Sequence, residues 1–283
     1  SDLVGQGAGG VVQGVVVTDT GAAVTAELNA GSLHVNVGVP AGVAVAFQGQ
    51  PTGVAPGTGL AYVSNLIEGA MGSEASVAKE ALLKGTTAIF DSMGATAESV
   101  NVNIVSLNGS GSNGTGNVTF TGQADSSDVM AFVMSSLTPN QTLVMQDVNA
   151  ALIVGGGSVQ VQGSNGAVIA ADTANQVIIG GAGNDTLIGG GGNDTLAGGA
   201  GANVFGVNTA SGSLVLADFD VKVDKLAFNF DGINRWEDLG PYFTGVTTDA
   251  QGNAVAQFGD LYNITFVGLR PEDITTDFLK FDI

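Results

Sequence analysis

The chain has 283 residues, of which 45 are glycine and none is cysteine, so disulfides and thiolate metal sites are excluded. Its formal charge of −19 arises from 26 acidic residues against seven lysines and arginines, and such a surface repels nucleic acids. The composition, 44% hydrophobic, excludes a disordered chain, and no apolar run approaches the ~18 residues of a transmembrane helix.

The first 56 residues contain only three charged side chains and consist of short β-branched runs separated by glycine. In one of these runs Leu33, Val35 and Val37 alternate with polar residues, which is the period of a strand. We therefore expect an antiparallel sheet with strands at 11–18, 22–28, 32–39 and 43–48.

The following segment mixes helix and strand signals. Apolar residues recur at helical spacing in 59–70 and 74–94, and both segments are predicted to be helices. Strands are expected at 99–107 and 117–123 on either side of a Gly/Ser/Asn turn, followed by a short helix at about 126–136.

From Thr142 onward the chain changes to strand-turn units of roughly nine residues. Each unit carries one short apolar run, and such a run cannot bury its apolar face alone. Stacking of successive units on one another buries a continuous core. This part of the chain is therefore predicted to be a parallel β-solenoid.

Three consecutive nonapeptides stand out within it: residues 180–206 read GGAGNDTLI, GGGGNDTLA and GGAGANVFG. The glycines allow a turn with positive φ, in which backbone carbonyls and the Asp at the sixth position converge on a cation. The apolar eighth residues are Leu187, Leu196 and Phe205, and they are expected to point inward. The oxygen-rich turns indicate calcium, Ca²⁺, as the cofactor.

These nonapeptides resemble those of the RTX (repeats-in-toxin) family of secreted bacterial proteins, whose repeats form a parallel β-roll. The resemblance implies a calcium ion between turns two repeats apart, so that Asp185 faces residues 198–201. The third repeat has Asn203 in place of the acid, and 171–179 has neither the glycines nor the acid of the pattern. We therefore expect few ions, on the order of one to four.

The chain after Phe205 resembles the closing strands of the C-terminal domain of serralysin-type secreted proteases. In that family the closing segment adds carboxylates to the last calcium turn. Asp218, Asp220 and Asp224 stand at the corresponding position of this chain. The full predicted ligand set is Gly181, Gly183, Asp185, Gly190, Gly192, Asp194, Gly199, Gly201, Asn203, Asp218, Asp220 and Asp224.

The predicted fold is thus mainly β in two parts. Residues 1–140 form a β-rich domain with two or three helices, and 141–283 form a calcium-binding β-roll with a closing cap. The start of the chain has no basic segment typical of a signal peptide, whereas its last residues resemble the RTX export signal. We therefore expect passage through a type I secretion apparatus and an extracellular or cell-surface location.

Catalysis is poorly supported by the sequence. His34 is the only histidine, so an HExxH zinc site and a histidine triad are excluded, and no Gly-x-Ser-x-Gly motif occurs. We expect no enzyme. A hydrolase of unrecognised type stays open as an alternative, and it would need a pocket with two or more convergent acids.

The apolar, almost uncharged N-terminal strands have the composition that promotes pairing between chains. We therefore expect self-assembly into an extracellular filament, sheath or surface layer, with residues 2–18 contacting a neighbouring copy more than their own chain. The remaining alternatives are a monomeric adhesin or ligand-binding module and a calcium-folding tail on an inert domain.

Overall fold

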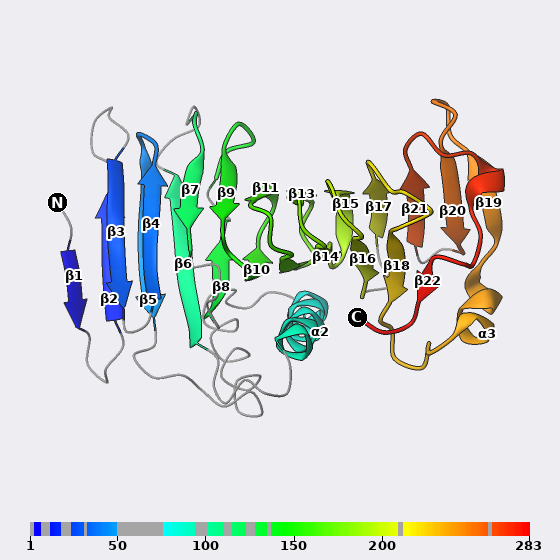
Figure 1. The fold of residues 1–283 in the computed structure, drawn as a ribbon, viewed down its shortest axis with the longest axis horizontal. Helices are drawn as coiled ribbons and strands as arrows, with labels where there is room; N and C mark the ends of the chain where they lie inside the picture. The colour runs from blue at the N-terminus through cyan, green and yellow to red at the C-terminus, as the bar shows by residue number, and fades with distance from the viewer. Residues whose placement is uncertain are drawn as a thin grey trace.

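Two extended β-sheets face each other across a shared core in the described part of the chain, and Figure 1 shows their strands side by side along the long axis of the molecule. The computed structural model describes residues 3–6, 12–17, 24–30, 33–49, 76–93, 101–109, 115–122, 128–134, 137–208, 212–259 and 262–283. Within these residues each sheet has 11 strands. The chain is mainly β with parallel strands, which confirms the predicted fold class.

Sheet A consists, in spatial order, of β1 (Leu3–Gln6), β2 (Val12–Val17), β5 (Val43–Gly49), β6 (Asn101–Gly109), β8 (Asp128–Val133), β10 (Ala150–Val154), β12 (Val168–Ala171), β14 (Thr186–Ile188), β16 (Val204–Val207), β18 (Lys225–Phe228) and β22 (Leu279–Lys280). Sheet B consists of β19 (Gly245–Thr248), β20 (Ala254–Phe258), β21 (Tyr262–Phe266), β17 (Gly212–Leu216), β15 (Gly192–Ala197), β13 (Gln176–Ile179), β11 (Gly157–Gln162), β9 (Thr142–Gln146), β7 (Val118–Thr121), β4 (Leu33–Val39) and β3 (Val24–Ala30).

Strands that follow one another in the chain from β6 to β18 alternate between the two sheets, so each pair of strands forms one coil of a roll. Within each sheet these strands pair in parallel, beginning with β6 and β8. The strands before β6 pair in antiparallel fashion, as predicted. β8 pairs with β10 in sheet A and β7 pairs with β9 in sheet B, so both sheets continue through the boundary expected at position 140.

One predicted element is wrong: the expected helix at 126–136 contains strand β8. Phe132 points between the sheets and is fully buried, while Val129 is buried on the opposite face of the strand. A run that is apolar on both faces is typical of a buried parallel strand. The strand has six residues, which is short for a helix, and periodicity alone does not separate a short buried strand from a helix.

The second predicted helix is confirmed as α2 (Ser76–Ser92), which packs on the outer face of sheet A over β10 and β12 (Figure 1). Leu82 and Ile89 are fully buried against the sheet. A Cβ atom at Gly85 would overlap the side chain of Ala170, so glycine permits this close approach. The predicted helix at 59–70 lies outside the described residues.

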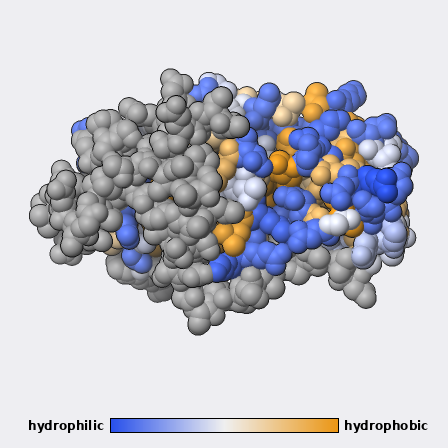
Figure 2. Space-filling model, turned by 90° about the horizontal axis from the view of Figure 1, so that it is seen from below, coloured by the Kyte–Doolittle hydropathy of each residue, from blue (hydrophilic) through white to orange (hydrophobic). Residues whose placement is uncertain are grey.

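Seen from the side on which α2 lies in Figure 1, hydrophilic residues cover much of the described surface, and hydrophobic residues gather near its middle (Figure 2). The short helix α3 (Trp236–Leu239) and the 3₁₀ helices η1 (Gly240–Tyr242) and η2 (Pro271–Asp273) belong to the C-terminal cap. Among the described residues, no helix combines the length and the apolar character that crossing a membrane requires.

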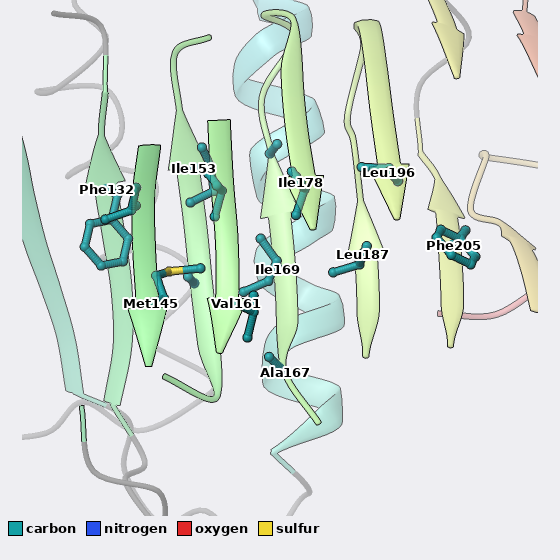
Figure 3. Packing of buried hydrophobic residues seen from close by; sticks show 14 of the residues in the cluster. Phe132, Met145, Ile153, Val161, Ala167, Ile169, Ile178, Leu187, Leu196 and Phe205 are labelled. Atoms are coloured by element: carbon teal, nitrogen blue, oxygen red, sulfur yellow. The ribbon is translucent and has the colours of Figure 1, made fainter. Parts of the chain in front are cut away.

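The main core fills the space between the two sheets. Inward residues of successive coils stack on one another, as Figure 3 shows for Ile169 and Leu187 in sheet A and for Ile178 and Leu196 in sheet B. Leu187, Leu196 and Phe205 are all fully buried, which confirms the inward position predicted for the eighth residue of each nonapeptide.

Strand β2 pairs along its full length with β5 of the same chain. This differs from the expectation that residues 2–18 add mainly to the sheet of a neighbouring copy. The end strands on this side of the molecule are β1 in sheet A and β3 in sheet B.

Candidate metal centre

The predicted ligands lie along the two long edges of the roll, in its turns or, for Gly192 and Asp194, at the start of strand β15. The first edge carries the turns that lead from sheet B to sheet A: 180–185, 198–203 and 217–224. The second edge carries the turns that lead from sheet A to sheet B, including 172–175 and 189–191. Asp185 and Asn203 lie on the first edge with Asp218, Asp220 and Asp224, whereas Asp194 lies on the second.

On the first edge the sixth residues of successive coils form a hydrogen-bonded column. Oδ1 of Asp185 accepts the N–H of Ala167 over 2.8 Å, and Oδ1 of Asn203 accepts the N–H of Asp185 over 2.9 Å. Oδ1 of Asp224 then accepts the N–H of Asn203 over 2.8 Å. Each sixth side chain therefore binds the backbone of the preceding coil on its own edge.

The second carboxylate oxygen closes each acidic turn. Oδ2 of Asp185 accepts the N–H of Gly181 over 2.9 Å, and Oδ2 of Asp224 accepts that of Asp220 over 2.9 Å. Asp185 was expected to face residues 198–201. Its hydrogen bonds instead run to Ala167 and to Gly181 of its own turn. Oδ2 of Asp185 nevertheless lies near the carbonyl oxygen of Gly198, because a Cβ atom built on Gly180 would contact both oxygens.

Burial makes these acids costly in their charged form. Asp185 and Asp194 are each 1% exposed, and within the described residues no lysine or arginine forms an ion pair with either. Burial raises the pKa of Asp185, and backbone hydrogen bonds from Ala167 and Gly181 oppose the shift. Burial likewise raises the pKa of Asp224, and the nearby carboxylates of Asp218 and Asp220 add to it. A bound cation would remove this penalty.

The glycines serve in two different ways. Gly190, Gly192, Gly199 and Gly201 have φ values of 80°, 85°, 79° and 106°, as the pattern predicts. Gly181 and Gly183 do not have positive φ, which corrects the expectation for the first repeat. A Cβ atom at Gly183 would overlap the backbone of Asn165 and Gly166 in the preceding turn, so glycine is required there by close packing.

Comparison with protein-family models matches residues 171–205 to the RTX calcium-binding nonapeptide repeat, in four copies. These residues are RTX repeats. RTX nonapeptide repeats bind calcium, so this segment of the protein is calcium-binding. No curated protein matches the chain in sequence.

The RTX match begins nine residues before the segment that the glycine pattern marked. Strand pairing aligns Val177 with Thr195, so Gln176 stands at the sixth position of the repeat 171–179. Neither Gln176 nor Asp172 is among the ligands that the glycine pattern predicts. Ile178 aligns with Leu196, the eighth residue of its nonapeptide. The sixth position lies two residues earlier, and in this repeat it is occupied by Gln176.

Asp172, Gln176 and Asp194 form the polar part of the second edge. Oδ1 of Asp194 accepts the N–H of Gln176 over 2.8 Å, and Nε2 of Gln176 donates to Oδ1 of Asp172 over 2.6 Å. Oδ2 of Asp194 is buried without a hydrogen-bond partner in the described part of the chain. Burial raises the pKa of Asp194 to about 8; the hydrogen bond from Gln176 opposes this shift and the charge of Asp172 adds to it.

Asp218 compensates for the amide at Asn203. Nδ2 of Asn203 is buried without a partner in the described residues, and it cannot accept an N–H as the second oxygen of Asp185 does. Asp218 instead accepts the N–H groups of Gly198 and Gly199, over 2.7 and 2.8 Å. The turn of the third RTX repeat is thereby closed from the next coil.

The donor set of the RTX turns fits calcium. Calcium takes six to eight oxygen ligands and accepts backbone carbonyls together with carboxylates. Within the described residues no three acidic or histidine side chains lie so that they could hold one ion together, so most ligands of any one ion would be carbonyl oxygens of the glycine turns. Each carboxylate oxygen has two lone pairs and can bind an ion beside the N–H that it already accepts. Coordination by the individual residues named above stays a prediction.

Proposed function

We propose that this protein is a secreted, non-enzymatic structural protein whose roll is stabilised by calcium outside the cell, and that its copies assemble into a filament, sheath or surface layer. Export through a type I secretion apparatus is part of the proposal, because RTX repeats are typical of secreted proteins. Extracellular calcium modules bind the ion with Kd values of about 10⁻⁴ to 10⁻³ M.

The observation that carries the calcium-dependent part is that Asp185 and Asp194 are buried and form no ion pair with a lysine or arginine of the described residues. A buried carboxylate is stable only when it is paired or protonated. At neutral pH and without calcium the turns therefore hold acids that favour unfolding. With calcium the same oxygens become ligands.

The observation that supports assembly is the pairing of the two end strands within the described residues. β1 and β3 are the end strands, and in the described part of the chain each pairs on one edge only, β1 with β2 and β3 with β4. β3 is seven residues long. Unpaired strand edges are templates for pairing with another chain. This replaces β2 by β1 and β3 as the strands through which neighbouring copies would join.

Electron microscopy and light scattering of the purified full chain, with and without calcium, test the proposal. We expect regular polymers with calcium and none after chelation. A protein that stays monomeric over the whole range of calcium and protein concentration would contradict the assembly and leave a calcium-binding monomer.

A monomeric adhesin or ligand-binding module is the second candidate, and one observation favours it. The C-terminal cap contains a cavity of about 110 Å³ lined mainly by apolar side chains, among them Trp236, Phe243 and Phe258. Apolar cavities of this size can hold a small apolar group. A calcium-loaded monomer that binds a small apolar ligand in this cavity would support the module over the polymer.

A further inference from the structure

The outer face of sheet B carries a continuous row of short, uncharged side chains. Strand pairing aligns them one to one across eight strands, from β9 through β11, β13, β15, β17, β21 and β20 to β19. The residues of this row, here called the outer strip, are Thr142, Ser158, Val177, Thr195, Val215, Thr265, Val255 and Thr247.

The outer strip is open to solvent. Each of its side chains is at least partly exposed, and Val177 is 39% exposed. Ile179, two residues along β13 on the same face, is 41% exposed. In contrast, α2 covers part of the outer face of sheet A. The two outer faces of the roll are therefore not equivalent.

Hydrophobic exposure concentrates on this face. Of the five large hydrophobic residues that are exposed in the described part of the chain, three lie here: Val177, Ile179 and Val267, which follows β21. All strip residues except Ser158 are β-branched, so their side chains are restricted in rotation and form a regular surface. Exposed apolar surface that is grouped in this way marks an interaction site.

Charge decides which partner fits. The whole chain carries −19, yet no strip residue is charged. Two copies that approach through most other surfaces repel each other, whereas two outer strips can meet without bringing like charges into contact. A strip with a regular repeat can also pack on a second identical strip, since facing sheets pack with strand directions within about 30° of each other.

We propose that the outer strip is the surface through which two copies of this chain pack face to face. The inference deepens the proposed self-assembly and rests on it. Eight strands about 4.8 Å apart, with two to three outward residues each, present roughly 500 Å² per copy. Two such faces bury about 1,000 Å², which is near the lower limit of specific interfaces. The contact therefore depends on protein concentration.

Sedimentation equilibrium of the calcium-loaded full chain tests this contact. The change Val177→Glu places a charge within each of the two paired strips and should weaken association at least tenfold. The change Val177→Thr keeps a β-branched residue of a kind the strip already contains, and it should associate like the wild type. The change Gln251→Glu adds the same charge in the exposed turn between β19 and β20 and should leave association unchanged.

The outcomes separate the strip from assembly as such. Circular dichroism first shows that each variant is folded. If the wild type and Val177→Glu associate equally, the strip is not the interface, and assembly through strand edges stands. If the wild type is a monomer at every concentration, both proposals are overturned. A monomer that insoluble chitin or cellulose removes from solution, and that Val177→Glu releases, would assign the strip to carbohydrate instead.

Discussion

The backbone N–H of Asp185 donates a hydrogen bond of 2.9 Å to Oδ1 of Asn203, eighteen residues later in the chain. Asn203 thus fixes the next coil to the turn of a predicted calcium ligand, although it carries no charge itself. The two residues occupy equivalent positions in their repeats, yet only Asp185 can neutralise a cation. Their substitutions should therefore have different signatures.

Replacing Asp185 by alanine should lower both calcium affinity and melting temperature, because it removes a charged ligand and two acceptors. Asn203→Ala should lower the melting temperature by leaving the N–H of Asp185 buried without a partner, at a cost of about 1–3 kcal/mol. It should change calcium affinity much less. Calorimetric calcium titration and thermal unfolding of both variants measure the two effects. Equal losses of affinity would mean that the assigned ligand set is wrong.

Stability without calcium should depend on pH through Asp194. Its pKa is raised to about 8 in the folded chain from 3.8, so between these values the folded state holds a proton that the unfolded state has lost. Stability is then highest at the acidic end and falls as pH rises through this window, by up to about 1.4 kcal/mol per pH unit. Urea unfolding at pH 5 and pH 8 in calcium-free buffer measures the slope.

The variant Asp194→Asn is the control for this dependence, since an amide does not titrate. It should flatten most of the slope in calcium-free buffer. Saturating calcium should flatten it in the wild type as well, because an ion in place of the proton keeps the site neutralised. A wild-type stability that rises between pH 5 and pH 8 without calcium would contradict the assigned pKa shift.

The close packing of successive turns predicts a strong effect of a single methyl group. Gly183→Ala should cost several kcal/mol, because the added Cβ atom would overlap backbone atoms of Asn165 and Gly166, which cannot move aside. Gly240→Ala is the matched control, since its Cβ atom would meet only Trp236, at 3.8 Å. Thermal unfolding of both variants in calcium compares them. A Gly183→Ala protein as stable as Gly240→Ala would show that the turns are not so tightly stacked.

Asp218 provides a test of the compensation at the third repeat. Asp218→Ala should leave the N–H groups of Gly198 and Gly199 without their acceptor and lower stability with and without calcium. Asp220→Ala should cost less, because its side chain accepts only the N–H of Lys222 in its own exposed turn. Hydrogen exchange at residues 198–203 reads out the difference. Equal protection in the two variants would remove the compensating role of Asp218.

The roll itself could be predicted because its signals are local and periodic. The nonapeptide spacing places Leu187, Leu196 and Phe205 in the core, and the β-branched runs separated by glycine predict β2 to β5 within two residues of their bounds, whereas β1 is not predicted. The sequence of strand Asp128–Val133 also fits a helix because it is apolar on both faces, and its pairing with β6 and β10 identifies it as a strand.

The acidic residues of the nonapeptides could be predicted from the sequence, whereas the residues that form hydrogen bonds with them could not. Asp185 and Asp194 follow from the pattern, whereas Gln176 and Asp172 lie in a repeat without glycines and become recognisable only through strand register. The outer strip is likewise formed by register, because its eight residues are spread from Thr142 to Thr265 without a common motif.

Thermal unfolding of the full chain with and without calcium, followed by circular dichroism, tests the central claim most directly. If the RTX turns bind calcium through buried acids, chelation should lower the melting temperature strongly and reduce the β-sheet signal, with residues 180–225 losing order. Adding calcium back should restore both. A spectrum and melting temperature that do not change on chelation would contradict the account.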